Sequence, residues 1–267
     1  QVVVWDVRAK ALPVQRTPLS ATGHTHPIYS IALQGSAASH TLVTASTDGM
    51  VARWNLGQLA QPMEVLHFRQ PPPDGKAPDD KRCVLGSESG DIYLAPTHAR
   101  STGSLQEFRG HYGMVTSVDI NPSKAKELQE LVLSSSVDWT TRLWHLKRGG
   151  AQPLLTFSHG TYDYVCDAKW SPKHPALFVT ANISGDLALW NLNHSTEDPL
   201  APPAAAAAGP AAALTKVAWA HDGRRLAVGD DGGVVRIYSI AEHVAIPQRP
   251  DEEARLEAML RGKGVLR

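Results

Sequence analysis

The chain has 267 residues, 42% of them hydrophobic and 19% charged, which is enough to bury a sizeable core in one large all-β domain or two ordinary domains. Its 26 basic and 26 acidic residues cancel, so nothing resembles the basic footprint of a nucleic-acid-binding protein. No apolar run of about 18 residues predicts a membrane span, and the two cysteines, Cys83 and Cys166, lack the spacing of a disulfide framework or a zinc site.

The first element in the chain is a short strand that ends at Trp5-Asp6. The sequence begins in mid-strand, so we expect residues 1–10 to be the tail of a repeat unit whose beginning lies outside this chain. A complete unit is expected at residues 24–68. Its strands are predicted at Ile28–Leu33, Thr41–Ser46, Val51–Asn55 and Met63–His67. Asp48-Gly49 lies between the second and third strands and supplies the positive φ of a tight hairpin turn.

The same succession of strand, turn and strand returns along the rest of the chain. Further units are expected at residues 81–108, 110–157, 159–193 and 214–240. The unit at 81–108 is degraded, because Ala95 stands where the other units have an aromatic residue. Residues 70–78 are rich in proline and are predicted to be a loop, and residues 198–213 are predicted to form a second, Ala/Pro-rich loop.

After Ile240 the strand pattern stops, and the sequence predicts a short helix at residues 250–262. Acidic residues occupy its first turn, and Leu256, Met259 and Leu260 recur at helical spacing. Such an apolar stripe needs a surface to cover it. That surface is either the β-domain of this chain or a helix of a partner protein, and the sequence leaves both open.

Four of the units end on an aromatic-polar pair that follows a tight turn by six residues. The pairs are Trp54-Asn55, Trp144-His145, Trp190-Asn191 and Tyr238-Ser239. A recurrence every ~40–50 residues indicates a repeat architecture. Small four-stranded sheets arranged radially make a β-propeller, so we predict an all-β propeller over residues 1–247. A repeated unit of this kind usually builds a binding surface, which lowers the odds of an enzyme.

Two units carry polar residues that can form one buried hydrogen-bond chain. The sets are His24, Ser46, Asp48 and Trp54 in one unit and His111, Ser136, Asp138 and Trp144 in another. The indole only donates, the hydroxyl donates and accepts, and the carboxylate accepts, so the chain can be fully satisfied and lock the sheet. The sets resemble catalytic constellations, but they recur by unit, which an active site does not. We interpret them as structural networks.

The sequence lacks the common motifs of catalytic sites. It has no Gly-x-Ser-x-Gly elbow, no His-Glu-x-x-His zinc helix and no phosphate-binding loop. The nearest acidic pair in a strand context, Asp163 and Asp167, is interpreted as solvated or turn carboxylates. We therefore predict that the protein is not an enzyme, holds no cofactor or metal, and contacts neither nucleic acid nor a membrane directly.

The Gly-His openings and Trp-Asp-like endings of the units resemble the WD-repeat β-propeller family. In this chain Asn55, His145, Asn191 and Ser239 stand in place of the Asp. Longer segments are similar to the C-terminal propeller of dynein intermediate chains, and most similar to the cytoplasmic-type branch. These segments are residues 14–20, 24–29, 46–49, 138–140, 164–172, 174–178, 189–193 and 227–230. A propeller of seven blades, which we expect here, would have nearly two blades on the N-terminal side outside this chain.

The resemblance implies a non-catalytic intermediate chain whose propeller binds the tail of the dynein heavy chain and scaffolds motor assembly and cargo attachment for microtubule-based transport. Dynein light chains and adaptors would bind through the region before the propeller. The expected location is the cytoplasm and cytoskeleton, with the cilium or flagellum as the alternative for an intraflagellar or axonemal dynein. A generic WD-repeat adaptor, such as a ubiquitin-ligase substrate receptor, is a further alternative.

Candidate partner contacts are large or charged side chains near strand ends and turns that the fold does not require. They are Arg53, Trp139, Arg142 and Lys169, together with Leu256, Met259 and Leu260 of the predicted helix. Trp139 is the sharpest, because it follows the turn residue Asp138, where a small or polar residue would suffice. Tryptophan and arginine are enriched at binding hot spots. The other interpretation is a tryptophan that packs on the neighbouring blade.

Overall fold

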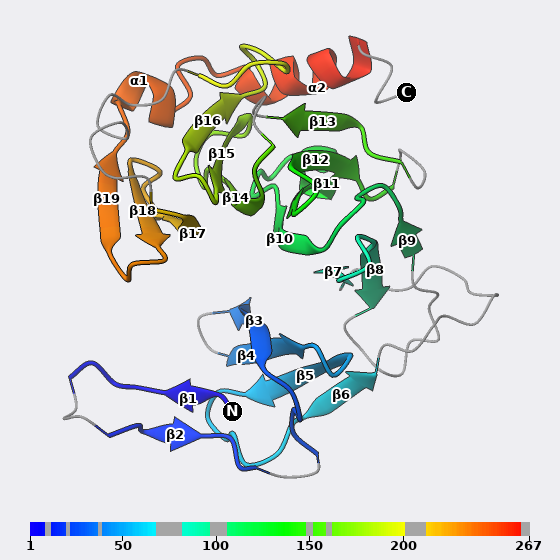
Figure 1. Ribbon diagram of the computed structural model, residues 1–267, viewed down its shortest axis with the longest axis vertical. Helices are drawn as coiled ribbons and strands as arrows, with labels where there is room; N and C mark the ends of the chain where they lie inside the picture. The colour runs from blue at the N-terminus through cyan, green and yellow to red at the C-terminus, as the bar shows by residue number, and fades with distance from the viewer. Residues whose placement is uncertain are drawn as a thin grey trace. The chain divides into compact units, whose positions relative to one another are not determined.

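The computed structural model describes residues 1–8, 12–19, 22–36, 39–67, 82–96, 106–147, 152–158, 162–200 and 212–262. The proline-rich stretch at 70–78 and most of the Ala/Pro-rich stretch at 198–213 lie outside the described residues. The chain divides into two compact units (Figure 1). Unit 1 is Gln1–Cys83 with Ala95–Leu105, and unit 2 is Val84–Leu94 with Gln106–Arg267.

Unit 1 contains a four-stranded antiparallel sheet in the order β3–β4–β5–β6. The strands are β3 (Ile28–Ser36), β4 (Ser39–Ser46), β5 (Met50–Asn55) and β6 (Glu64–His67). A strand therefore lies at each of the four places predicted for this part of the chain. A separate antiparallel pair joins β1 (Val3–Val4) to β2 (Gln15–Arg16), and the sequence did not predict β2. Leu42, Met50 and Trp54 form the buried core of the unit.

The other four described sheets belong to unit 2, apart from residues 82–83 and 95–96 of the first sheet, which count with unit 1. The strands of each sheet follow one another in sequence order. The first sheet has β7 (Arg82–Gly86), β8 (Ile92–Pro96) and β9 (Gln106–Phe108). The second has β10 (Val115–Ile120), β11 (Leu131–Ser136), β12 (Thr140–His145) and β13 (Leu155–Ser158). The third has β14 (Val165–Trp170), β15 (Leu177–Asn182) and β16 (Leu187–Asn191). The fourth has β17 (Leu214–Trp219), β18 (Arg225–Asp230) and β19 (Val235–Ser239).

The core of unit 2 lies between successive sheets. All six residues of β11 and all six of β15 are buried, because these strands lie inside their sheets and have neighbours on both faces. Phe157 of β13 meets Phe178 of β15 edge to face, with 5.1 Å between the ring centroids. Each large apolar side chain that is fully buried in this way contributes about 1.5–3 kcal/mol to stability. The sheets are therefore held together mainly by face-to-face apolar packing.

Two helices follow the last strand, α1 (Glu242–Ala245) and α2 (Glu252–Gly262). The α2 helix lies at the place predicted for the C-terminal helix, with Glu252 and Glu253 in its first turn and Arg261 in its last, where the helix dipole favours these charges. In Figure 1 it lies beside β13 and β16.

The apolar stripe of α2 packs on the chain's own sheets. Leu256 and Leu260 are fully buried in the cluster that contains Phe178 and Trp190, and Met259 packs against that cluster. The sequence left two surfaces open for this stripe, and in the structure the stripe packs on the β-domain of this chain. Leu256 and Leu260 are fully buried within the chain, whereas Met259 is only partly buried, and a partner contact of this helix stays a prediction.

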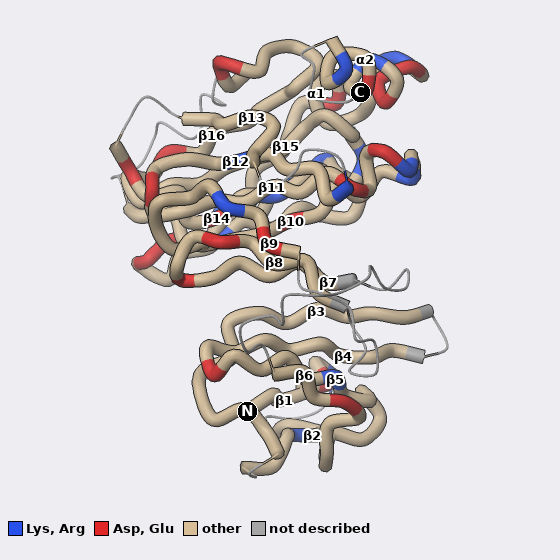
Figure 2. The backbone as a smooth tube through the Cα atoms, turned by 90° about the vertical axis from the view of Figure 1, so that its right-hand side faces the viewer, with Lys and Arg blue, Asp and Glu red and all other residues tan. Residues whose placement is uncertain are grey.

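The chain is mostly β, and its repeated small antiparallel sheets with a short C-terminal helix are consistent with the blades of a β-propeller. The number of blades and their boundaries stay predictions. Acidic and basic residues are interspersed along the tube of Figure 2. Among the described residues, no helix has the length and hydropathy needed to cross a bilayer.

Candidate functional site

A tryptophan in each of three sheets donates its indole N–H to a buried hydroxyl in the neighbouring strand. The distances from Nε1 to the hydroxyl oxygen are 2.9 Å for Trp54 and Thr44, 2.7 Å for Trp144 and Ser134, and 3.0 Å for Trp190 and Thr180. In the second sheet, Trp144 pairs directly with Val132, and Ser134 is its diagonal neighbour. Diagonal neighbours in a sheet lie within reach of an aromatic side chain.

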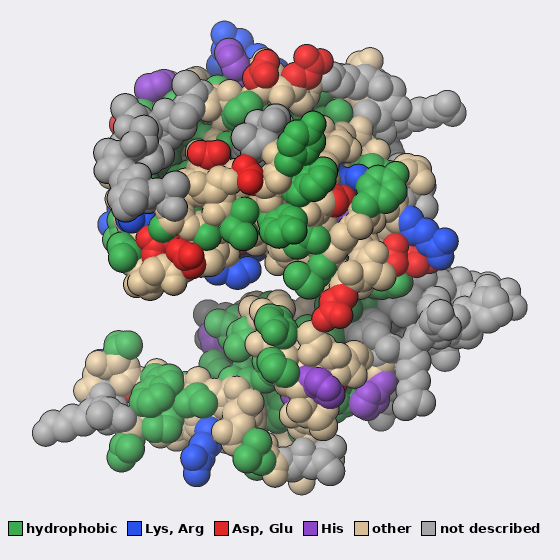
Figure 3. Space-filling model, in the orientation of Figure 1, with side chains coloured by type: hydrophobic (Ala, Val, Ile, Leu, Met, Phe, Trp, Pro, Cys, Tyr) green, Lys and Arg blue, Asp and Glu red, His purple; other side chains and the backbone are tan. Residues whose placement is uncertain are grey.

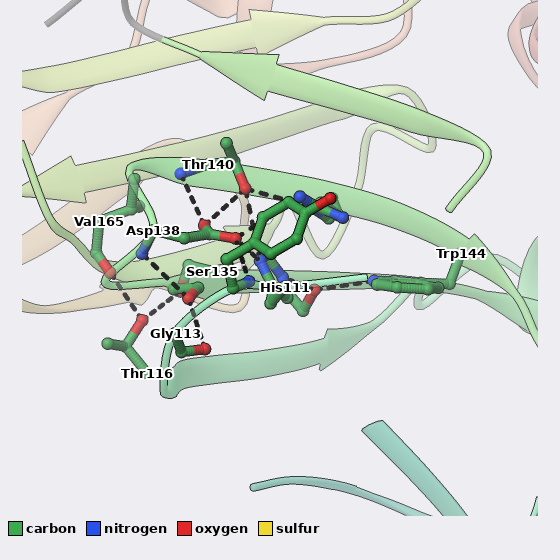
Figure 4. A network of polar contacts seen from close by, with 12 residues as sticks. His111, Gly113, Thr116, Ser135, Asp138, Thr140, Trp144 and Val165 are labelled. Carbon is green, nitrogen blue, oxygen red and sulfur yellow. Dashed lines mark hydrogen bonds and ion pairs between the residues drawn. The ribbon is translucent and has the colours of Figure 1, made fainter. Parts of the chain in front are cut away.

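A histidine and an aspartate extend two of these pairs, one of which is drawn in Figure 4. His111 Nε2 lies 2.7 Å from Ser134 Oγ, and His111 Nδ1 lies 2.8 Å from Asp138 Oδ2. Because Ser134 Oγ already accepts the indole proton, its own proton can go to Nε2, which leaves the Nδ1 proton for the carboxylate. His24 makes the same contacts in unit 1, at 2.7 Å to Thr44 Oγ1 and 3.3 Å to Asp48 Oδ2.

The histidine, aspartate and tryptophan of both predicted networks are brought together, but the predicted serines are not the link. Ser136 Oγ instead donates to Gly113 O at 2.9 Å and accepts from the Asp138 N–H at 3.1 Å. Ser46 Oγ accepts from the Asp48 N–H at 3.4 Å. Ser136 lies one step beyond Ser134 on the same strand face, past the reach of the indole nitrogen.

A spacing in the sequence could have found the correct hydroxyls. Thr44, Ser134 and Thr180 each precede the tryptophan they serve by ten residues. The regular hairpin of each sheet keeps that interval constant. Sequence reasoning missed it because Ser46 and Ser136 lie two residues before the turn aspartates and carry a hydroxyl of the same chemistry.

The carboxylates of these networks are held in their ionised form. Burial by itself would raise the pKa of Asp138, but hydrogen bonds from His111 and Thr140 and from a backbone N–H outweigh it, so the pKa lies well below its usual range. The pKa of Asp48 is lowered as well, because backbone N–H groups and His24 oppose the effect of burial.

The arrangement does not suit catalysis. Ser134 is fully buried, and its oxygen is shared between His111 and Trp144, so no substrate can reach it. Cys83 and Cys166 are unpaired thiols, and burial raises the pKa of Cys83 to about 11, which makes it a poor nucleophile. Among the described residues, no group of His, Cys, Asp and Glu is placed to hold a metal ion.

Trp139 occupies a turn position that glycine fills in the other sheets. Its φ is +70°, and among the described residues it is the one non-glycine residue with a positive φ. The equivalent third turn residues are Gly49, Gly90, Gly185 and Gly233, with φ between +73° and +93°. A left-handed conformation costs a bulky L-residue roughly 1–2 kcal/mol. The side chain is 42% exposed, and its ring meets that of Tyr162 edge to face at 5.2 Å.

The other predicted contact residues are partly engaged within the chain. Arg53 Nη1 lies 2.9 Å from Glu64 Oε2 in unit 1, and its side chain is mostly buried. Arg142 Nη2 lies 3.5 Å from Asp138 Oδ2, and the guanidinium stands over the ring of Tyr112 at 5.7 Å. Both cations therefore stabilise their own sheets.

Lys169 keeps more of its side chain in solvent. Its Nζ lies 3.4 Å from Asp119 Oδ1 at the edge of an open hollow of about 340 Å³. The hollow is lined by Asp119, Ile120, Pro122, Lys169, Trp170, Pro172, Trp219 and His221. Burial raises the pKa of Asp119, and Lys169 opposes that shift only in part.

Comparisons with known proteins agree with this geometry. Residues 16–55, 102–145 and 208–239 match the family described as WD domain, G-beta repeat. The chain is also 38% identical, over 270 residues, to the cytoplasmic dynein 1 intermediate chain of Drosophila melanogaster. The match covers 97% of this chain. The chain is a WD-repeat domain of the dynein intermediate chain type. It spans 40% of the length of that relative.

The WD repeats account for the recurring networks. The repeat-ending tryptophans Trp54, Trp144 and Trp190 are the indole donors, and in two of the repeats the turn aspartate fixes the histidine. Two of the matched ranges end at the pairs Trp54-Asn55 and Trp144-His145, and the third ends at Tyr238-Ser239. The polar sets that resemble a catalytic site are therefore features of the repeat.

Proposed function

We propose that this chain acts as a non-catalytic scaffold in a dynein motor, with its WD-repeat domain bound to the tail of the dynein heavy chain. The main support is the 38% identity to a dynein intermediate chain, which extends over 97% of this chain and so includes its loops as well as its repeats. The polar networks are buried and so serve the fold. The side chains of the described turns and outer faces remain for protein contacts, which also supports the proposal.

The scaffold would connect the motor to its cargo. We propose that light chains and adaptors bind a region that precedes the WD-repeat domain, and that the protein works in the cytoplasm on the cytoskeleton. The named relative is of the cytoplasmic type, and this observation favours transport in the cytoplasm over an intraflagellar or axonemal dynein.

The experiment is to purify the tagged full-length protein from its own cells and identify the heavy chains that come with it by mass spectrometry. A cytoplasmic dynein heavy chain is expected in stoichiometric amount. Recovery of a ciliary heavy chain in its place would show that the protein is an intermediate chain of a ciliary dynein. Recovery of ubiquitin-ligase subunits without any dynein heavy chain would refute the motor assignment.

A contact test belongs to the same experiment. Among the predicted contact residues of the sheets, Trp139 and Lys169 keep the most solvent exposure. Trp139→Ala and Lys169→Ala should lower heavy-chain recovery, whereas Tyr29→Ala serves as the matched control, since Tyr29 is 78% exposed on a strand of unit 1. If both variants fold and still recover the heavy chain in full, these two residues are not part of the interface.

A further inference from the structure

We propose that one face of unit 2 binds a Lys- or Arg-bearing segment of a partner protein, with a cationic side chain seated in the corner formed by the rings of Trp139 and Tyr162. This face, called the aromatic face below, consists of residues 87–91, 111–114, 137–140, 162–164 and 182–186. Each range is either a turn between two strands or the approach to the first strand of a sheet.

Direct contacts join these segments into one surface. The Val115 N–H donates to Ser87 O at 3.0 Å, and the Tyr112 N–H donates to Asp138 Oδ2 at 3.0 Å. The Ile183 N–H donates to Tyr164 O at 3.0 Å. Together with the ring contact of Trp139 and Tyr162, these bonds connect three neighbouring sheets of unit 2. The aromatic face is therefore continuous within a single compact unit.

Aromatic side chains on this face are exposed to an unusual degree. Tyr112 is 93% exposed, Tyr162 is 83% exposed, and Tyr164 is 46% exposed. Figure 3 shows how hydrophobic side chains group on the visible surface of unit 2. The turn itself does not require a tryptophan, because glycine fills the equivalent turns without strain. Strained residues of this kind cluster at binding sites.

The ring geometry suits a cation. The planes of Trp139 and Tyr162 meet at 77° with centroids 5.2 Å apart, so they form two walls of a corner. A guanidinium or ammonium group over an aromatic face is attracted by the ring quadrupole. The same unit already contains one such contact, since the Arg142 guanidinium stands 5.7 Å from the centroid of Tyr112.

The charges of the aromatic face favour the same class of partner. Its five segments contain five carboxylates and no Lys or Arg. The carboxylates are Glu88, Asp91, Asp138, Asp163 and Asp186. Arg142 reaches the face from β12, but its guanidinium is paired with Asp138. A nucleic acid could also stack on the rings, but its phosphates would be repelled by this excess of negative charge.

The inference deepens the proposed function, because it states the chemistry of a segment that a partner would offer to this face. It rests on the proposed function only for the expectation that a partner protein exists. The test below uses no heavy chain, so failure of the peptide to bind and failure to recover a heavy chain are separate outcomes.

The test measures the binding of a labelled, repeating Arg-Gly-Ser peptide to the full chain by fluorescence anisotropy. A repeating Glu-Gly-Ser peptide of equal length and a uridine oligonucleotide are the comparison probes. The Arg peptide should bind, with affinity that falls as salt rises, and the two anionic probes should not. Trp139→Gly and Tyr162→Ala should each weaken the Arg peptide about fivefold, the value of one exposed cation–π contact.

Two matched variants keep the result independent of folding. Trp139→Gly places the residue of the equivalent turns at this position, so the sheet should remain intact by circular dichroism. Tyr29→Ala removes an exposed ring from unit 1 and should leave the affinity unchanged. Equal affinity of the wild type and the Trp139→Gly variant, or equal binding of the Arg and Glu peptides, would overturn the proposal, as would preferred binding of the oligonucleotide.

Discussion

At the scale of single residues, a hydroxyl shared by a histidine and a tryptophan holds two of the WD repeats together. Ser134 Oγ lies 2.7 Å from both His111 Nε2 and Trp144 Nε1, and all three side chains are buried. Water cannot replace a lost partner at such a site without a cavity to hold it. The hydroxyl is therefore worth more than a single hydrogen bond.

Ser134→Ala should lower the free energy of unfolding by about 2–3 kcal/mol, because two buried ring nitrogens lose their partner at once. Ser136→Ala removes bonds to backbone groups near the turn and should cost about 1 kcal/mol. Chemical denaturation followed by tryptophan fluorescence would give both values. A larger loss for Ser136→Ala would mean that the link through Ser134 is wrong.

The network also makes stability depend on pH. The pKa of Asp138 is lowered in the folded state, so its carboxylate contributes stability that is fully present above the unfolded pKa of about 3.9 and is lost as pH falls toward the folded value. The wild type should therefore be more stable than Asp138→Asn at neutral pH, and this advantage should shrink as pH falls below about 4.

Denaturation midpoints of the two proteins, measured across that pH range, test this prediction. Asp48 contributes in the same direction but is present in both proteins, so it cancels from the difference. A difference that stays constant between neutral and acidic pH would show that the charge of Asp138 does not stabilise the fold.

At the scale of elements, the C-terminal helix belongs to the β-domain. Leu256 and Leu260 are fully buried among residues of β13, β15 and β16 and of the short 3-10 helix Leu128–Glu130. The helix covers apolar residues of these sheets, so its stripe is buried within the chain. A partner that approaches α2 meets its polar side.

Leu260→Ala should lower the free energy of unfolding by about 2–4 kcal/mol, because it removes buried apolar atoms and leaves a cavity. Ala258→Ser, on the exposed side of the same helix, is the matched control and should change stability by less than about 0.5 kcal/mol. Thermal unfolding by circular dichroism can measure both. Equal stability of the two variants would indicate that α2 is detached from the sheets in solution.

At the scale of the whole molecule, the repeat pattern made most of the fold predictable. The turn signals and aromatic-polar endings placed the strands, because each hairpin has a nearly constant length. The strand β2 and the helix α1 were not foreseen, since two residues and four residues are too short to show a period. The stripe of α2 was visible in the sequence, but the choice of its packing surface depends on the tertiary arrangement.

The candidate site was predictable only in part. The turn position of Trp139 singled it out, and the structure adds the positive φ and the contact with Tyr162. Tyr112 and Tyr162 were missed, because an isolated tyrosine before a strand has no recognisable spacing. Arg53 and Arg142 carry charges that a binding site could use, but the sequence does not reveal that acidic residues within the chain pair with them.

Hydrogen bonds from inner-strand side chains also connect neighbouring sheets of unit 2. Asp119 Oδ2 accepts the Trp170 N–H at 2.8 Å, and Asp167 Oδ2 accepts the Val217 N–H at 3.0 Å. The Thr116 hydroxyl donates to Val165 O at 2.6 Å. Any sliding of one sheet past the next must break such bonds together with the apolar packing. Under tension, these three sheets would share the load as one stiff elastic body, a mechanical property that would suit the motor scaffold proposed above.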